Sequence, residues 1–238
     1  MMKTFSKYAL VLAILIIPAV SLAAEFRVGE QPSTRADEGV VGNVYMAGAT
    51  VTSAGSVVGD LVAGGGSLVV SGDVGEDVLI GGGNVTILSN IAHDVRVGGG
   101  NIVIQGRIGG DLIGGGGQFT VGGPGIAGDV VIGGGTVRID APVAGNVRIG
   151  GGNVYINAPI TGSVDINADT VTLGSGAVIS GALNYTASKE LVKESGAVVT
   201  GPVHFELHPG KVAPAEPAVA FAAILSLWVL IQPRKDGE

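Results

Sequence analysis

Apolar residues recur along most of the chain with a period of about 17 residues. Two consecutive units show it best, GDVVIGGGTVRIDAPVA over Gly128–Ala144 and GNVRIGGGNVYINAPIT over Gly145–Thr161. In each unit the apolar residues occupy positions 3 and 5, positions 10 and 12, and position 16. Pairs at alternate positions indicate short strands with one buried face, and the repeat has no helical period. A repeat of this length predicts a stack of equivalent structural units.

The period begins at about Gly42 and weakens after Ser180. The other units are Gly42–Val58, Gly59–Gly75, Glu76–Ala92, His93–Gly109, Gly110–Ala127, Gly162–Ser180 and Gly181–Thr200, the last two being irregular. Three short strands per unit describe one turn of a parallel β-helix, whose equivalent positions form ladders ~4.8 Å apart. The sequence therefore predicts an all-β fold, a single-stranded parallel β-helix of about eight to nine coils, and eight coils would give a rod of roughly 38 Å.

Glycine runs occur in the middle of most units, for example Gly64–Gly66 and Gly133–Gly135. We expect them to stack as one corner, because glycine accepts positive φ and close backbone approach. A phosphate-binding loop is excluded, since no Lys-Ser/Thr follows any run. The unequal intervals of seven, six and four between the anchors at positions 3, 10 and 16 disfavour a left-handed hexapeptide helix and favour a right-handed coil.

The ends of the sequence differ from the repeat. Residues 1–23 are typical of a signal peptide, with Lys3 and Lys7 before an apolar run and small residues at Ser21–Ala23; an uncleaved anchor is the alternative. Residues 24–41 are expected to be a flexible lead-in to a repeat domain at 42–208. Either interpretation of residues 1–23 predicts an extracytoplasmic location, in the periplasm or at the cell surface.

Residues 209–217 contain three prolines and predict a spacer, and residues 218–232 predict a short membrane-associated helix. The fourteen uncharged residues of Ala218–Ile231, apolar except for one serine, would span ~21 Å as a helix, less than the ~30 Å hydrocarbon core of a bilayer. A short or tilted span, an interfacial helix and part of a longer membrane segment remain open. Packing of this helix against the end of the rod is the alternative to membrane association.

Composition narrows the function further. The chain has no cysteine, so disulfides and thiolate metal sites are excluded. Its formal charge of −7 becomes −9 without Lys3 and Lys7 (−7 − 2), and the absence of a basic patch argues against nucleic acid as a partner. The regular coils offer no insertion long enough to wall an active-site cleft. We therefore expect no enzyme, no catalytic residues, no cofactor and no metal.

Some columns nevertheless carry candidate chemistry. One column at position 2 contains Asp60, Asp77, Asp94, Asp111 and Asp129. Stacked carboxylates could bind divalent cations, but Gly-Asp is also common turn chemistry in which the side chain accepts backbone amide hydrogen bonds, and we favour the latter. A polar column at position 9, from Thr50 to Thr170, is expected to form side-chain hydrogen bonds along the stack. Its Thr-x-Thr pairs are too interrupted for an ice-binding face.

Two further sets of residues are candidate sites. Arg96 and Arg148 share a column but would lie three coils apart, roughly 14 Å. His204, Glu206 and His208 would share one strand face with spacing suited to zinc, although a solvated face is the simpler interpretation. At the ends of the rod, the charges Lys189, Glu190, Lys193 and Glu194 are expected to cap the C-terminal edge, which leaves the N-terminal edge open.

The unit GDVxIGGGxVxI, seen at Gly128–Ile139 and Gly145–Ile156, resembles that of bactofilin-like, polymer-forming β-helix proteins over about residues 42–205. The resemblance implies a right-handed β-helix that assembles end to end without nucleotide, often at a membrane, as a scaffold. The signal sequence and the C-terminal apolar segment depart from typical, cytoplasmic bactofilins. We expect a self-associating structural scaffold of the cell envelope tethered through residues 218–232, with an adhesin that uses a polar or Asp ladder for glycan or calcium as the alternative.

Overall fold

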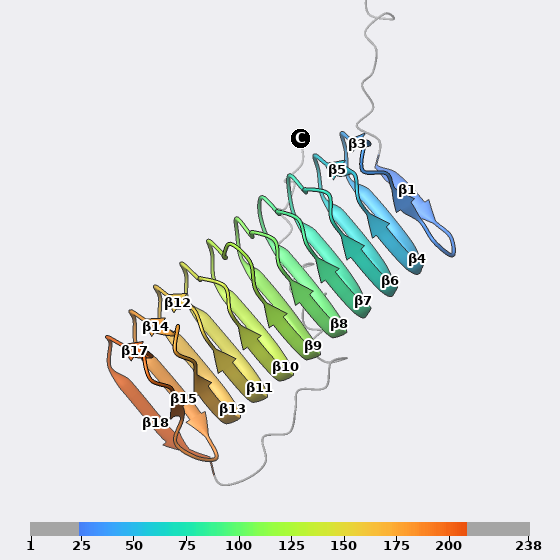
Figure 1. Ribbon diagram of the computed structural model, residues 1–238. Coiled ribbons are helices and arrows are strands. Elements are labelled where there is room, and N and C mark those ends of the chain that lie inside the picture. Colours follow the sequence, from blue (N-terminus) through green and yellow to red (C-terminus); the bar gives the residue numbers. More distant parts are fainter. Residues whose placement is uncertain (1–23, 209–238) are drawn as a thin grey trace, which may run out of the picture.

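The computed structural model describes residues 24–208, which form a parallel β-solenoid of about eleven turns (Figure 1). One long sheet of thirteen parallel strands runs along the rod, and eleven of them follow one another in the order β1-β4-β6-β7-β8-β9-β10-β11-β13-β15-β18, while β2 pairs with β4 and β16 with β13. Because neighbouring strands lie ~4.8 Å apart, the ten steps between them give a rod of roughly 48 Å. The expected all-β parallel solenoid is confirmed, whereas the expected count of eight to nine coils is too low.

The main strands of the interior coils are all ten residues long. They are β4 (Val44–Ser53), β6 (Leu61–Val70), β7 (Val78–Ile87), β8 (Val95–Ile104), β9 (Leu112–Val121), β10 (Val130–Ile139), β11 (Val147–Ile156) and β13 (Val164–Leu173). Shorter strands form the ends and the third side: β1 (Glu25–Val28), β2 (Ser33–Thr34), β3 (Gly39–Val40), β5 (Ser56–Val57), β12 (Pro159–Ile160), β14 (Val178–Ile179), β15 (Leu183–Ala187), β16 (Val192–Lys193), β17 (Val198–Val199) and β18 (Val203–Leu207).

The apolar columns form the core, as the periodicity predicts. Position 3 pairs in register from coil to coil, as in Val78↔Val95, and its members from Val44 to Val164 are fully buried. Positions 5, 10 and 12 are buried in the same way, and position 16 forms a ladder of single bridges from Val57 to Ile160. The interior of the rod is therefore one continuous aliphatic stack along its whole length.

The glycine runs differ from the expected positive-φ corner. Each main strand continues through its run, and among the described residues the glycines with positive φ are Gly123, Gly125 and Gly196, none of which belongs to a run. Before the run the side chains at the odd positions 3 and 5 point inward, and after it those at the even positions 10 and 12 do. The side of the strand that faces the core therefore shifts by one residue within the glycine run. The expectation of three separate strands per unit is thus also corrected, because the first two are continuous.

Close packing between coils explains the middle glycine of each run instead. A Cβ at Gly82 would lie 2.3 Å from the carbonyl oxygen of Gly65, and one at Gly151 would lie 2.4 Å from that of Gly134. By contrast, a Cβ at the first glycine, Gly133, would meet nothing within 4 Å. Within the runs, a side chain at the middle or last position would therefore press against the neighbouring coil, whereas the first position has room for one at Gly133 and Gly150.

The segment expected to be a flexible lead-in forms the first coil. β1 pairs with β4 in the register Glu25↔Val44, β2 pairs with the end of β4, and β3 pairs with β5. The offset from Glu25 to Val44 is 19 residues, and charged residues occupy inward positions, so the 17-residue apolar pattern does not reveal this coil. The expectations for residues 1–23, 209–217 and 218–232 fall outside the described residues.

Candidate assembly ends and lateral columns

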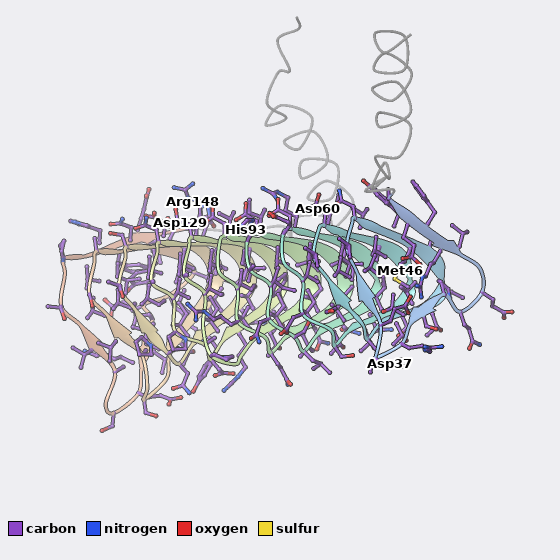
Figure 2. All side chains as sticks on the ribbon, turned by 90° about the horizontal axis from the view of Figure 1, so that it is seen from above. Asp37, Met46, Asp60, His93, Asp129 and Arg148 are labelled. Carbon is purple, nitrogen blue, oxygen red and sulfur yellow. The ribbon has the colours of Figure 1, made fainter. Side chains whose placement is uncertain are left out.

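The side chains of the aspartate column accept hydrogen bonds from the backbone of the next coil. In each coil the Oδ1 atom of the position-2 side chain accepts a hydrogen bond from the backbone N–H of the equivalent residue one coil further on. The distances are 3.1 Å from Asp77 N to Asp60, 3.0 Å from Asp94 N to Asp77, 2.8 Å from Asp111 N to Asp94, and 2.7 Å from Asp129 N to Asp111. Figure 2 labels Asp60 and Asp129 along the same edge of the rod. The structure supports the interpretation as turn chemistry.

Arginine pairs with part of this column. Arg96 donates to Asp94 Oδ2 at 3.0 Å and to Asp77 Oδ2 at 3.3 Å, and its side chain is only 15% exposed. Within residues 24–208, no group of three or more His, Asp or Glu side chains is arranged to hold a metal ion. The aspartates therefore stabilise the stack by satisfying amides at the corner between coils.

The remaining candidate residues, namely the polar column at position 9, the histidines of the last strand and Arg148, lie in different parts of the rod. At position 9, Asn101 donates to Asn84 at 2.9 Å and Thr170 to Asn153 at 2.7 Å, as expected for a polar ladder. His204 and Glu206 lie exposed on the outer face of β18, and His208 follows the strand. Unlike Arg96, Arg148 is exposed; it lines a groove of about 490 Å³ of mixed polar and apolar character with Asp165, Asn184, His204 and Phe205.

The N-terminal end of the rod is closed by an ionic cluster. Glu25 and Arg27 pair in register with the inward residues Val44 and Met46, so they occupy core positions at the edge of the stack. The guanidinium of Arg27 donates to Glu25 at 2.7 Å and also binds both carboxylate oxygens of Glu38 and the carbonyl of Ser33. Inward charges at an edge strand oppose pairing with another chain.

The electrostatics of the cluster follow from these hydrogen bonds. The Arg27 guanidinium lowers the pKa of Glu38 below its usual range, and the backbone N–H of Arg35 contributes in the same direction. The hydrogen bond from Arg27 to Glu38 likewise raises the pKa of Arg27, against the opposing effect of desolvation. The hydrogen bonds between Arg27 and Glu38 therefore favour the charged form of both side chains.

The C-terminal end has the opposite character. Val203, Phe205 and Leu207 of β18 pair in register with Leu183, Tyr185 and Ala187, which are buried. The three β18 residues thus continue the inward columns, but no further described coil covers them, and their side chains are exposed. The outer edge of β18 has no partner strand among the described residues. Within residues 24–208, an uncovered apolar core and an unpaired strand edge therefore meet at this end.

The expected distribution of caps is therefore reversed. Lys193 belongs to β16, which pairs with β13 on the side of the rod, and Lys189 and Glu190 lie exposed just before it. These charges precede the final strand and do not cover it. The N-terminal cluster was not predicted from the sequence, because Glu25 and Arg27 were not assigned to a coil. The alternation Glu-x-Arg shortly before the repeat could have indicated a strand with inward charges.

Comparison of the chain with family models, curated proteins and solved structures found no match. Within residues 24–208 there is also no helix long and apolar enough to cross a membrane.

Proposed function

We propose that this protein is a non-enzymatic structural scaffold of the cell envelope, whose rods associate through their C-terminal ends and are tethered to the membrane by residues 218–232. The observation that carries the proposal is the uncovered end formed by Val203, Phe205 and Leu207 beside the free edge of β18. The resemblance of the repeat to bactofilin-like proteins and the signal-like residues 1–23 support the same function and an extracytoplasmic location.

The chemistry of the two ends favours contact between like ends. If the C-terminal end met the N-terminal end of another rod, Phe205 would face Glu25 and Arg27, and their charges would be desolvated against an apolar surface. If two C-terminal ends meet, apolar side chains cover each other and the two β18 strands supply the missing hydrogen bonds. Such an interface is self-complementary, as a twofold dimer requires.

Sedimentation velocity tests this contact. The chain should sediment as a dimer, and Phe205→Asp should raise the dimer dissociation constant at least about 30-fold, because it buries a charge at the centre of the interface. Phe26→Asp is the matched control, since Phe26 also stacks on the tyrosine of a neighbouring coil but at the other end. Leu225→Asp controls for association through the apolar segment. An unchanged dimer in Phe205→Asp would refute the contact.

An adhesin is the alternative function, and the column of polar side chains in the groove beside Arg148 is the observation that favours it. Arg148, Asp165 and Asn184 lie in one outward column at successive coils, a spacing that suits a linear polar ligand. A scaffold should dimerise with or without calcium and oligosaccharide, whereas an adhesin should bind one of them as a monomer.

A further inference from the structure

An apolar groove runs along the outer face of β1, β4, β6 and β7. Tyr45, Val62 and Leu79 follow one another in register at the outward position 4 of β4, β6 and β7, and Phe26 of β1 stacks on Tyr45 with 4.8 Å between ring centroids. Figure 1 shows these four strands side by side at the blue end of the rod. The groove measures about 400 Å³, and Phe26 and Val28 are 70% and 79% exposed.

Two features shape this groove. At position 6 the glycines Gly64 and Gly81 leave its floor without side chains, so a bulky apolar group can approach the backbone of the sheet. The groove ends at β8, where the next residue of the outward column is Arg96, which forms ion pairs with Asp77 and Asp94. The groove therefore covers four strands, or ~19 Å along the rod.

The length of the chain after β18 matches the distance to this groove. The last described strand ends at Leu207 on the same face of the rod, six inter-strand steps or ~29 Å from β8. The proline-containing spacer 209–217 would cover ~28 Å if extended. As the helix that the sequence predicts, the uncharged Ala218–Ile231 would then extend ~21 Å further, over the four strands of the groove.

We infer that, in the absence of a membrane, the apolar segment 218–231 of the same chain docks in the groove formed by Phe26, Val28, Tyr45, Val62 and Leu79. The docked state covers both apolar surfaces, the groove and the segment, which otherwise face water. The inference rests on the proposed function in one respect, since the same segment is the proposed tether. A bilayer would compete with the groove for it.

The chain itself supplies two specific probes. It contains no cysteine, so an introduced pair can form only one disulfide within a molecule, and Trp228 is its single tryptophan and lies in the segment. With the docked geometry above, Ser226 lies ~12 Å into the helix and therefore between β6 and β4, next to Val62. The test is a Val62→Cys/Ser226→Cys variant, oxidised in dilute solution without lipid.

We expect an intramolecular disulfide in at least tenfold higher yield than in the control Val131→Cys/Ser226→Cys. Val131 belongs to the same outward column, is exposed, and lies nearer to β18, so a free tail would reach it more easily than Val62. In the otherwise unaltered chain, Trp228 emission should be blue-shifted, and Leu79→Asp should shift it to the red. Neither measurement requires a change in the core of the rod.

Each outcome is decisive for the docking. Equal yields for the two cysteine pairs, or a Trp228 emission typical of water, would overturn it, and a disulfide between two molecules would show that the groove takes the segment of a second copy. Addition of phosphatidylcholine vesicles separates the two proposals. Loss of the disulfide yield with vesicles supports docking and tether together, a yield unaffected by vesicles supports docking without the tether, and vesicle binding without any disulfide supports the tether alone.

Discussion

At the N-terminal end of the rod Phe26 stacks on Tyr45, and at the C-terminal end Phe205 stacks on Tyr185, with 4.8 Å between ring centroids in both pairs. The two pairs face different surroundings. Phe26 points outward into the lateral groove, because the inward positions of β1 belong to Glu25 and Arg27. Phe205 points inward along the core column, and the outward positions of β18 belong to His204 and Glu206.

The two ends thus differ in which alternate residues of the terminal strand face the core. Alternate residues of a strand face opposite sides, so a one-residue change in the pattern determines whether charges or apolar groups cover the core. At β1 the charges face inward and close the stack, whereas at β18 they face outward and leave it open. A β-solenoid can therefore encode which of its ends associates in very few residues.

The largest expected effect comes from making the N-terminal end resemble the C-terminal end. The variant Glu25→Val/Arg27→Val/Glu38→Gln places apolar residues in register with Val44 and Met46 and removes the charge of Glu38. Both ends should then associate, so that dimers give way to filaments visible by negative-stain electron microscopy.

The control for this variant changes the exposed charges of the same coil, Arg35→Val/Asp37→Val/Glu30→Gln, and alters the net charge equally. It should remain dimeric, because Arg35 and Asp37 form an exposed pair away from the core. Filaments in the control, or none in the cluster variant, would show that the inward charges do not determine which end is closed.

A smaller effect separates the stability of the stack from the association of its ends. Gly82→Ala should lower the free energy of unfolding by about 3 kcal/mol, because its Cβ would lie 2.3 Å from the Gly65 carbonyl oxygen in the neighbouring strand. Gly133→Ala, where the Cβ has open space, should be neutral or slightly stabilising. Chemical denaturation measures both.

Neither glycine variant should change the dimer dissociation constant, since both lie in interior coils. If the two substitutions destabilise equally, glycine is required for backbone conformation throughout the run, and the account of close packing between coils is wrong.

Acid should produce the smallest effect, and at one end only. Hydrogen bonding to Arg27 holds the pKa of Glu38 below its usual range. The stabilising contribution of Glu38 is therefore complete above the pH at which an ordinary glutamate titrates, and it is lost as the pH falls through the lowered pKa. Amide exchange in β1 should accelerate under those conditions, relative to the interior strand β9, and Glu38→Gln should remove the pH dependence. Equal acceleration in both strands would contradict this.

The interior of the rod was predictable from the sequence because each apolar column repeats with one spacing, and burial follows directly from the alternation of positions such as Val130 and Ile132. The first coil was not predictable in this way, since Glu25 and Arg27 take the place of the apolar residues that define the columns of Val44 and Met46. The role of the glycine runs was also hidden, because a sequence does not distinguish a positive φ from close backbone approach. The ends were misassigned because the charges at Lys189–Glu194 precede the last coil rather than cover it.

The most direct test of the account is hydrogen exchange of the intact protein, measured by mass spectrometry at low and high protein concentration. The account predicts that the amides of β18 become protected as the concentration rises, because two β18 edges pair, while the amides of β1 exchange at an unchanged rate. Protection that rises at β1 instead, or at neither end, would contradict the conclusion that the rod associates through its uncovered C-terminal end.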